Sequence, residues 1–217
     1  MKTIKGGFFI TFEGGEGCGK TTVAKNIEQW LKDKGYKVFY TREPGGIPVA
    51  EQIRDLVVNN FTALGPVPQL MLYSASRYLN TMQNIKPQMR DGAIVICDRY
   101  YLSSLVYQGA VGGVHIADVK NITKLATDGL VPDINFTLNV SAEVGLRRAA
   151  ERGGEVNEID TLSIKFHDQI NKAYQYYTDP TNGYLINAEL PIEDVIATVQ
   201  HNIIKELKSI EYRIKEE

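Results

Sequence analysis

The chain has 217 residues, of which 43% are hydrophobic and 23% charged, and a formal net charge of −2. This composition does not indicate a disordered protein or the basic surface of a nucleic-acid-binding protein. No apolar run approaches the ~20 residues that cross a bilayer, and Glu13 interrupts the first apolar segment too early for a signal peptide. Two cysteines are too few for a disulfide framework. We therefore expect a cytoplasmic protein with one domain over residues 1–217.

Short β-rich segments alternate with amphipathic helical segments along the chain. A strand is predicted at 8–13 and a helix at 20–33, where apolar side chains recur at helical spacing. The remaining predicted elements are strands at 37–41, 93–97, 134–140 and 183–187 and a helix at about 193–210. Connections of this length between strands require right-handed crossovers. The predicted fold class is therefore α/β, with a five-stranded parallel sheet flanked by helices.

The segment between the first strand and the first helix, residues 14–21, matches the pattern G-x-x-x-x-G-K-[ST]. Its glycines let consecutive backbone N–H groups point at a phosphate, and the helix that follows adds its dipole. Lys20 can reach the β- and γ-phosphates, and the Thr21 hydroxyl can hold Mg²⁺. We predict that a nucleoside triphosphate contacts Gly14, Gly15, Glu16, Gly17, Cys18, Gly19, Lys20, Thr21 and Thr22. Within this loop, Cys18 is either a redox-sensitive thiol or a small side chain that fills space.

Three classes of phosphate-loop protein compete for this sequence. A GTPase needs an Asn-Lys-x-Asp motif, but Asn171 and Lys172 are followed by Ala173 and Tyr174. A DNA-remodelling or mechanochemical ATPase usually has a larger core and additional sensor elements. A small-molecule kinase remains.

Several further motifs follow in a specific order. They are T-R-E-P-G-G at 41–46, L-Y-S-A-S-R at 72–77, D-R-Y-x-x-S-S-x-x-Y-Q-G at 98–109 and G-L-V-P-D at 129–133. Over about residues 8–205 the chain resembles thymidylate kinase of the bacterial type, a phosphate-loop kinase. This resemblance implies transfer of the γ-phosphoryl group of ATP to dTMP by a cytoplasmic homodimer. It also implies Mg²⁺ as cofactor and a short lid at about 148–160.

The resemblance implies a base-binding role for the segment that contains Tyr73 and Arg77. Tyr73 would stack on thymine, although the family more often has Phe there, and Arg77 would hydrogen-bond the base. The two residues are four apart and lie on one face of a helix; a core tyrosine and a solvated arginine are the alternative. The residues expected to bind dTMP are Glu16, Glu43, Pro44, Arg54, Tyr73, Arg77, Arg99, Ser104, Tyr107 and Gln108. Among them, Tyr107 would lie against the sugar, and Ser104 and Gln108 would help to recognise the base.

Arginine side chains match the geometry of phosphate oxygens. Arg42, Arg54 and Arg99 are therefore candidates for holding the monophosphate, and the resemblance implies Arg54 and Arg99 most directly. Asp98 follows an apolar strand, where it would hold Mg²⁺ together with Thr21 or cap a helix.

The residues expected to act in catalysis are Lys20, Arg99, Arg148 and Arg152. In the lid, Asn157 and Glu158 stand where relatives usually have an Asp-Arg pair, so Arg148 and Arg152 would carry the missing charge; Arg148 could also be only a helix-face residue. Two other functions stay open, namely a kinase for another pyrimidine nucleotide or nucleoside and a nucleotide-binding regulator with impaired catalysis.

Overall fold

A computed structural model describes residues 1–151 and 158–216. Its five strands form one parallel sheet in the order β2-β3-β1-β4-β5. The strands are β1 (Phe8–Glu13), β2 (Val38–Arg42), β3 (Ile94–Asp98), β4 (Ile134–Asn139) and β5 (Gly183–Asn187). Each predicted strand lies within one residue of the observed one at both ends. The predicted parallel sheet is confirmed.

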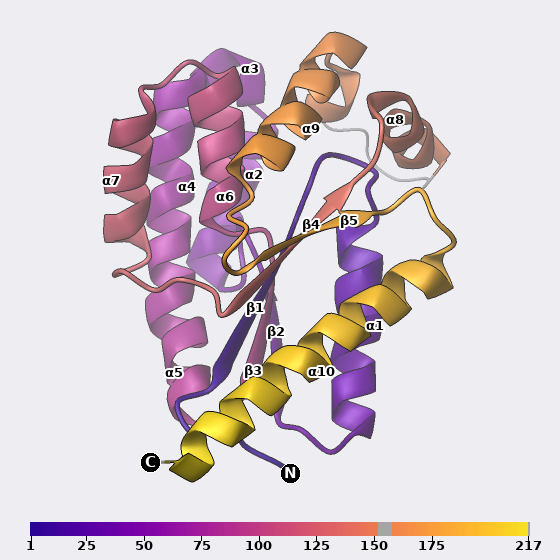
Figure 1. Ribbon diagram of the computed structural model, residues 1–217. Helices are drawn as coiled ribbons and strands as arrows, with labels where there is room; N and C mark the ends of the chain where they lie inside the picture. Colours follow the sequence, from indigo (N-terminus) through magenta and orange to yellow (C-terminus); the bar gives the residue numbers. More distant parts are fainter. Residues whose placement is uncertain (152–157, 217) are drawn as a thin grey trace.

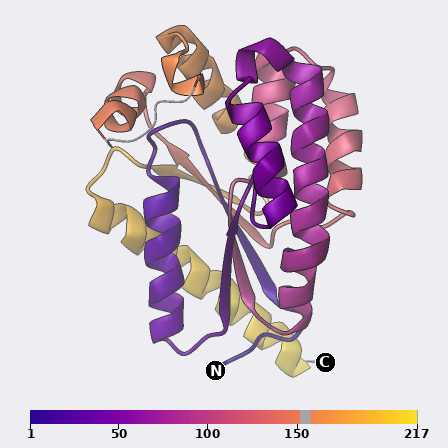
Figure 2. The same cartoon turned by 180° about the vertical axis from the view of Figure 1, so that it is seen from behind.

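Helices cover both faces of this sheet (Figures 1 and 2). The α-helices are α1 (Lys20–Asp33), α2 (Pro48–Val58), α3 (Phe61–Leu64), α4 (Pro66–Asn80), α5 (Lys86–Arg90), α6 (Tyr101–Ser104), α7 (Ile116–Ala126), α8 (Ala142–Glu151), α9 (Ile164–Tyr177) and α10 (Ile192–Glu216). The sequence predicted α1 at its observed bounds, whereas α10 extends beyond the predicted end at 210. Among the described residues, no helix is long and apolar enough to cross a membrane.

The central strand β1 is buried along its whole length, because β3 and β4 flank it and helices cover both of its faces. Phe8, Ile10 and Phe12 point to the core that α1 and α10 complete. Phe9 points to the other face and packs against Tyr100, with 5.0 Å between the ring centroids. The strand is therefore buried on both faces, as central parallel strands usually are, although Thr11 and Glu13 share the face of Phe9.

The carboxyl ends of the strands meet at one edge of the sheet, near α8 and α9 in Figure 1. The phosphate loop leaves β1 there, and Arg42 and Asp98 end the neighbouring strands β2 and β3. In open parallel sheets, ligands bind in the crevice beyond these ends. The fold thus gathers the motifs into one region.

Three further helical segments are not α-helical, and two of them are continuous with α-helices. They are the π-helices η1 (Thr81–Ile85) and η2 (Leu105–Val111) and the 3₁₀-helix η3 (Ile159–Thr161). Tyr107 and Gln108 lie on η2. π-Helical turns are rare and occur often at functional sites.

Candidate active site

The phosphate loop closes around the side chain of Lys20, the first residue of α1. The Lys20 ammonium donates hydrogen bonds to the carbonyl oxygens of Gly14 (3.0 Å) and Gly15 (2.7 Å) and is buried. Gly14 has φ +140°, and a Cβ there would collide with the carbonyl oxygen of Leu138. No side chain in the described part of the chain caps α1, so its first N–H groups are available to an anion.

Cys18 lies in the same loop, but its thiol is buried and packs in the core on the α1 side of the sheet. The residues predicted to bind the donor phosphates, 14–22, thus lie together in this loop and at the start of α1. The thiol itself does not face solvent.

Thr21 and Asp98 meet beside this loop. The Thr21 hydroxyl donates to Oδ2 of Asp98 over 2.5 Å, and the Tyr40 hydroxyl donates to the same oxygen over 3.4 Å. Asp98 does not cap the next helix, because Tyr100 occupies the cap position of α6. A hydroxyl and a carboxylate are oxygen ligands of the kind that Mg²⁺ prefers. Among the described residues, no group of three or more His, Cys, Asp and Glu side chains could hold a metal, and Mg²⁺ does not require one.

Arg99 connects the end of β3 to the phosphate loop. Its φ of +70° is unusual for a residue with a side chain, and its backbone N–H donates to the carbonyl oxygen of Phe12 over 2.8 Å. The guanidinium group forms an ion pair with Glu16 and donates to the Gly14 carbonyl and the Tyr174 hydroxyl, both over 3.1 Å. Non-glycine residues in such conformations cluster at functional sites.

The charge state of Glu16 follows from these contacts. Burial raises the pKa of the Glu16 carboxyl, but the positive charges of Arg99 and Lys20 outweigh it and lower the pKa to about 2. The Tyr107 hydroxyl also donates to Glu16 over 3.2 Å. Glu16 is therefore an anion at neutral pH, although it lies in a loop suited to phosphate.

Glu13 is a second carboxylate of this region, and no sequence motif assigned it to the site. It accepts hydrogen bonds from the Tyr100 N–H (2.7 Å), the Ser103 hydroxyl (2.6 Å) and the Tyr174 hydroxyl (3.2 Å). Complete burial raises its pKa. These bonds hold the turn that contains Arg99 against the end of β1. The available signal was an acidic residue at the end of a largely apolar strand.

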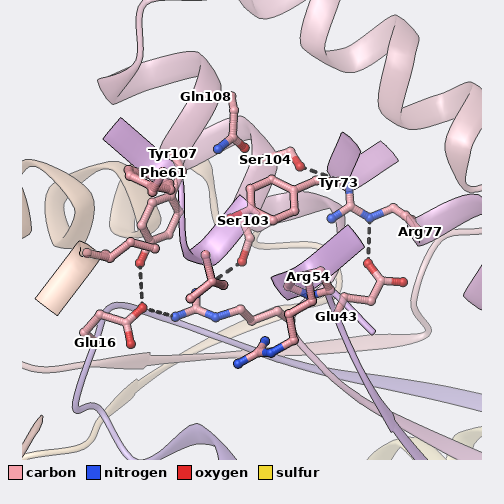
Figure 3. Close-up of a pocket in the computed structure, with 14 residues that line it drawn as sticks. Glu16, Glu43, Arg54, Phe61, Tyr73, Arg77, Ser103, Ser104, Tyr107 and Gln108 are labelled. Atoms are coloured by element: carbon pink, nitrogen blue, oxygen red, sulfur yellow. Dashed lines mark hydrogen bonds and ion pairs between the residues drawn. The ribbon is translucent and has the colours of Figure 1, made fainter. Parts of the chain in front are cut away.

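A cavity opens between the sheet edge and the helices α2, α4 and η2 (Figure 3). The residues predicted to bind dTMP all line this cavity, namely Glu16, Glu43, Pro44, Arg54, Tyr73, Arg77, Arg99, Ser104, Tyr107 and Gln108. It is also lined by Val58 and Phe61, which no motif pointed to, by Ser103 of the 98–109 motif, which was given no role, and by Ile159 of the predicted lid. The aromatic and apolar walls with a few polar groups are typical of a site for a small organic ligand.

Arg77 is 3% exposed and therefore not the solvated residue of the alternative interpretation. Its Nε donates to Glu43 over 2.7 Å, and its terminal nitrogens donate to the Ser104 hydroxyl (2.9 Å) and the Tyr100 carbonyl (3.0 Å). Three of its five N–H groups are thus engaged within the protein. Burial raises the pKa of the nearby Tyr73 to about 12, so that hydroxyl stays protonated at neutral pH.

A second cavity lies beside the phosphate loop and is lined by Lys20, Thr21, Asp98 and Arg148, among others. Glu16, Glu43, Arg54 and Arg99 line both cavities. The two cavities are therefore neighbouring parts of one cleft.

Two arginines on this cleft differ in their partners. Arg42 forms an ion pair with Glu51 over 2.7 Å, whereas no described carboxylate lies within ion-pair distance of Arg54. Burial lowers the pKa of Arg54, and the positive charges of Arg42 and Arg99 lower it further, although the negative charge of Glu51 offsets part of this effect. Arg54 is therefore a half-buried cation among other cations, which is the environment of an anion site.

The predicted lid is only partly described. Arg148, at the end of α8, lines the second cavity and donates to the Ala188 carbonyl over 2.7 Å. Glu158 accepts a hydrogen bond from the Thr62 N–H over 2.8 Å. Arg152 and Asn157 lie outside the described residues, so the lid at about 148–160 stays a prediction.

A parallel sheet of this strand order, a phosphate loop after its central strand and a second ligand cavity in the same cleft define a phosphate-loop nucleotide kinase. Residues 12–199 match the family model described as thymidylate kinase. The chain belongs to the thymidylate kinase family.

Individual relatives agree with this assignment. The chain is 37% identical over 206 residues to thymidylate kinase of Bacillus pumilus, covering 93% of this chain and 97% of the relative. It is 39% identical over 198 residues to thymidylate kinase of Clostridium novyi, covering 89% and 97%. The crystal structure of thymidylate kinase from Ehrlichia chaffeensis superposes with a TM-score of 0.74 at 27% identity, covering 91% of this chain and 98% of that one.

Proposed function

We propose that this protein transfers the γ-phosphoryl group of ATP to dTMP and releases ADP and dTDP. Its membership of the thymidylate kinase family supports this reaction. The observation that carries the proposal is the cleft with two adjoining cavities, which share Glu16, Glu43, Arg54 and Arg99. One cavity contains the phosphate loop for the donor, and the other has the aromatic and polar walls of a pocket for the acceptor.

The donor phosphates bind to the loop from Gly14 to Thr22, and Lys20 exchanges its loop carbonyls for phosphate oxygens. The free N–H groups at the start of α1 support this assignment. Thr21 and Asp98 fit Mg²⁺ because they present a hydroxyl and a carboxylate oxygen side by side. When bound, Mg²⁺ neutralises charge on the β- and γ-phosphates.

The acceptor lies in the other cavity, with its base between Tyr73 and the buried polar groups of Arg77, Ser104 and Gln108. Tyr107 and Glu16 then face the sugar. Arg54, which has no carboxylate of the described residues within ion-pair distance, holds the monophosphate together with Arg99, and the lining residues Glu43 and Pro44 complete the wall. A guanidinium group suits a phosphate because it donates two parallel hydrogen bonds.

Catalysis rests on positioning and on positive charge, because the transition state of phosphoryl transfer is loose and needs little covalent chemistry. Lys20, Arg99 and Arg148 surround the second cavity and supply that charge, with Arg152 added from the lid. A phosphate monoester has a second pKa of about 6. Its oxygen is therefore already ionised at neutral pH, and no strong general base is required.

A homodimer is part of the proposal. Val67, Met71 and Tyr78 lie on one side of α4 and are each about half exposed, as are Val49 and Leu56 of α2. Adjacent exposed apolar side chains are typical of protein interfaces. The cytoplasm is the proposed compartment, since Cys18 and Cys97 are both free thiols.

The test is ADP formation with dTMP, dUMP, dCMP and thymidine as acceptors, with Lys20→Met as the inactive control. The proposal expects dTMP to be the preferred acceptor. A preference for thymidine over dTMP would show a nucleoside kinase instead. Tight binding of both nucleotides without ADP formation would show a regulator that has lost catalysis.

A further inference from the structure

A chain of three hydrogen-bonding groups ends at the acceptor cavity. Gln69 of α4 donates from Nε2 to the Phe61 carbonyl oxygen over 2.5 Å, and Gln108 of η2 donates from Nε2 to Oε1 of Gln69 over 3.1 Å. Both glutamine side chains are almost completely buried, at 4% and 1% exposure. Gln108 lines the cavity and Gln69 does not; Figure 3 shows Gln108 near Ser104 and Tyr107.

Which groups donate and which accept these hydrogen bonds follows from chemistry alone. A backbone carbonyl oxygen can only accept a hydrogen bond, so the Gln69 amide must turn its NH₂ group toward Phe61. The side-chain oxygen of Gln69 then faces Gln108, and Gln108 must donate a hydrogen bond to it from its own NH₂ group. The same donors and acceptors result whichever amide atom is labelled nitrogen and whichever oxygen.

As a result, the side-chain oxygen of Gln108 is left without a protein donor among the described residues. It is not among the completely buried polar atoms that lack a partner, so it is open to the cavity. The cavity therefore has a fixed hydrogen-bond acceptor at this position. An unconstrained glutamine could present either end of its amide.

We propose that Gln69 is a positioning residue that fixes Gln108 as an acceptor for the N3–H group of the pyrimidine base. The inference rests on the proposed function of this cavity. Thymine and uracil carry a proton on N3, whereas cytosine has a lone pair there. With dCMP, the lone pairs of the Gln108 oxygen and of cytosine N3 would face each other without a hydrogen bond. Buried polar sites discriminate strongly against a ligand that leaves such groups unpaired. Gln69 thus sets the preference for dTMP over dCMP without touching the substrate.

The test compares wild type with Gln69→Met, a substitution of similar size that cannot accept from Gln108 or donate to Phe61. The amide of Gln108 is then free to rotate. We expect the ratio of kcat/KM for dTMP to that for dCMP to fall about five- to tenfold, mainly through the KM values of the two acceptors. The KM for ATP is expected to stay unchanged. Gln83→Met, at an exposed position on η1, is the matched control.

A double-mutant cycle separates this role from a general structural one. If Gln69 acts through Gln108, then Gln69→Met has no further effect on the dTMP-to-dCMP ratio once Gln108 is also Met. A fall in activity that is equal for both acceptors would overturn the proposal. An effect that persists in the Gln108→Met background would overturn it as well.

A measurement on the wild-type protein covers the case in which Gln69→Met does not fold. dTMP methylated at N3 lacks the proton, so we expect it to inhibit at least tenfold more weakly than dTMP binds. Equal binding would contradict the fixed acceptor. Absence of dTMP phosphorylation by the wild type would instead refute the proposed function, so the two failures can be distinguished.

Discussion

Replacement of Arg54 by methionine separates binding of the acceptor phosphate from stability of the fold. Arg54 lines both cavities and has no described carboxylate partner, whereas Arg42 in the same cleft is paired with Glu51. Methionine keeps most of the aliphatic length of arginine and removes only the charge and its hydrogen bonds.

The expected magnitude follows from the partners of Arg54. A hydrogen bond from a charged donor contributes about 1.5–3 kcal/mol, so kcat/KM for dTMP should fall roughly 10- to 150-fold. Stability should not fall with it. Arg54→Met breaks no ion pair of the described residues, and the repulsion from Arg42 and Arg99 that it removes offsets the lost attraction to Glu51. The free energy of unfolding should therefore change by no more than about 0.5 kcal/mol.

The assay is ADP formation over a range of dTMP concentrations at saturating ATP, together with urea unfolding of the free protein. Arg42→Met is the control, because its ion pair with Glu51 is solvent-exposed and contributes at most about 1 kcal/mol. An equal loss of kcat/KM in both variants would refute the special role of Arg54. So would a loss of stability in Arg54→Met large enough to explain its lower activity.

Other predictions follow from the buried charges. Arg77→Ala leaves the buried Glu43 without its ion-pair partner and should destabilise the fold by about 3–5 kcal/mol in urea unfolding; Arg77→Met combined with Glu43→Leu should regain stability but not dTMP affinity, and recovery of that affinity would contradict a base-binding role. Lys20→Met should lower kcat about 100-fold or more with little change in dTMP binding measured by calorimetry, and a selective loss of dTMP binding would speak against a donor role. The pKa of Glu16 is about 2 instead of 4.5, so its carboxylate stabilises the fold fully above pH 4.5, and this contribution of about 3 kcal/mol disappears as the pH falls toward 2. Urea unfolding should therefore show the stability difference between wild type and Glu16→Gln shrinking over that range, and a constant difference would contradict the assigned pKa.

The sheet was predictable because each strand is a short apolar run between turn residues. The run A-I-V-I-C has no polar face, and the structure buries all of β3 between β1 and β2. The family assignment was likewise predictable from motifs, and it is confirmed by a match over residues 12–199. Motifs at the ends of parallel strands come together for a topological reason, so their convergence on one cleft could also be inferred.

Other features depend on contacts that no local pattern encodes. Phe61 reaches the acceptor cavity from a segment without a motif, and Ile159 reaches it from the segment predicted as a lid. The ion pair of Arg77 with Glu43 joins residues 34 positions apart, so the sequence could not show that this arginine is already engaged. The π-helical turn at Gln108 and its link to Gln69 arise from the packing of η2 against α4, which the helical period alone does not predict.

The most direct test of the central claim is a crystal structure with dTMP, Mg²⁺ and a non-hydrolysable ATP analogue. The account predicts thymine beside Tyr73 and Arg77, and the dTMP phosphate between Arg54 and Arg99. An oxygen of that phosphate should lie ~3–3.5 Å from the γ-phosphorus at Lys20, the separation of reacting atoms poised for transfer. Binding of dTMP outside this cavity, or of the two nucleotides in places where their phosphates cannot meet, would contradict it.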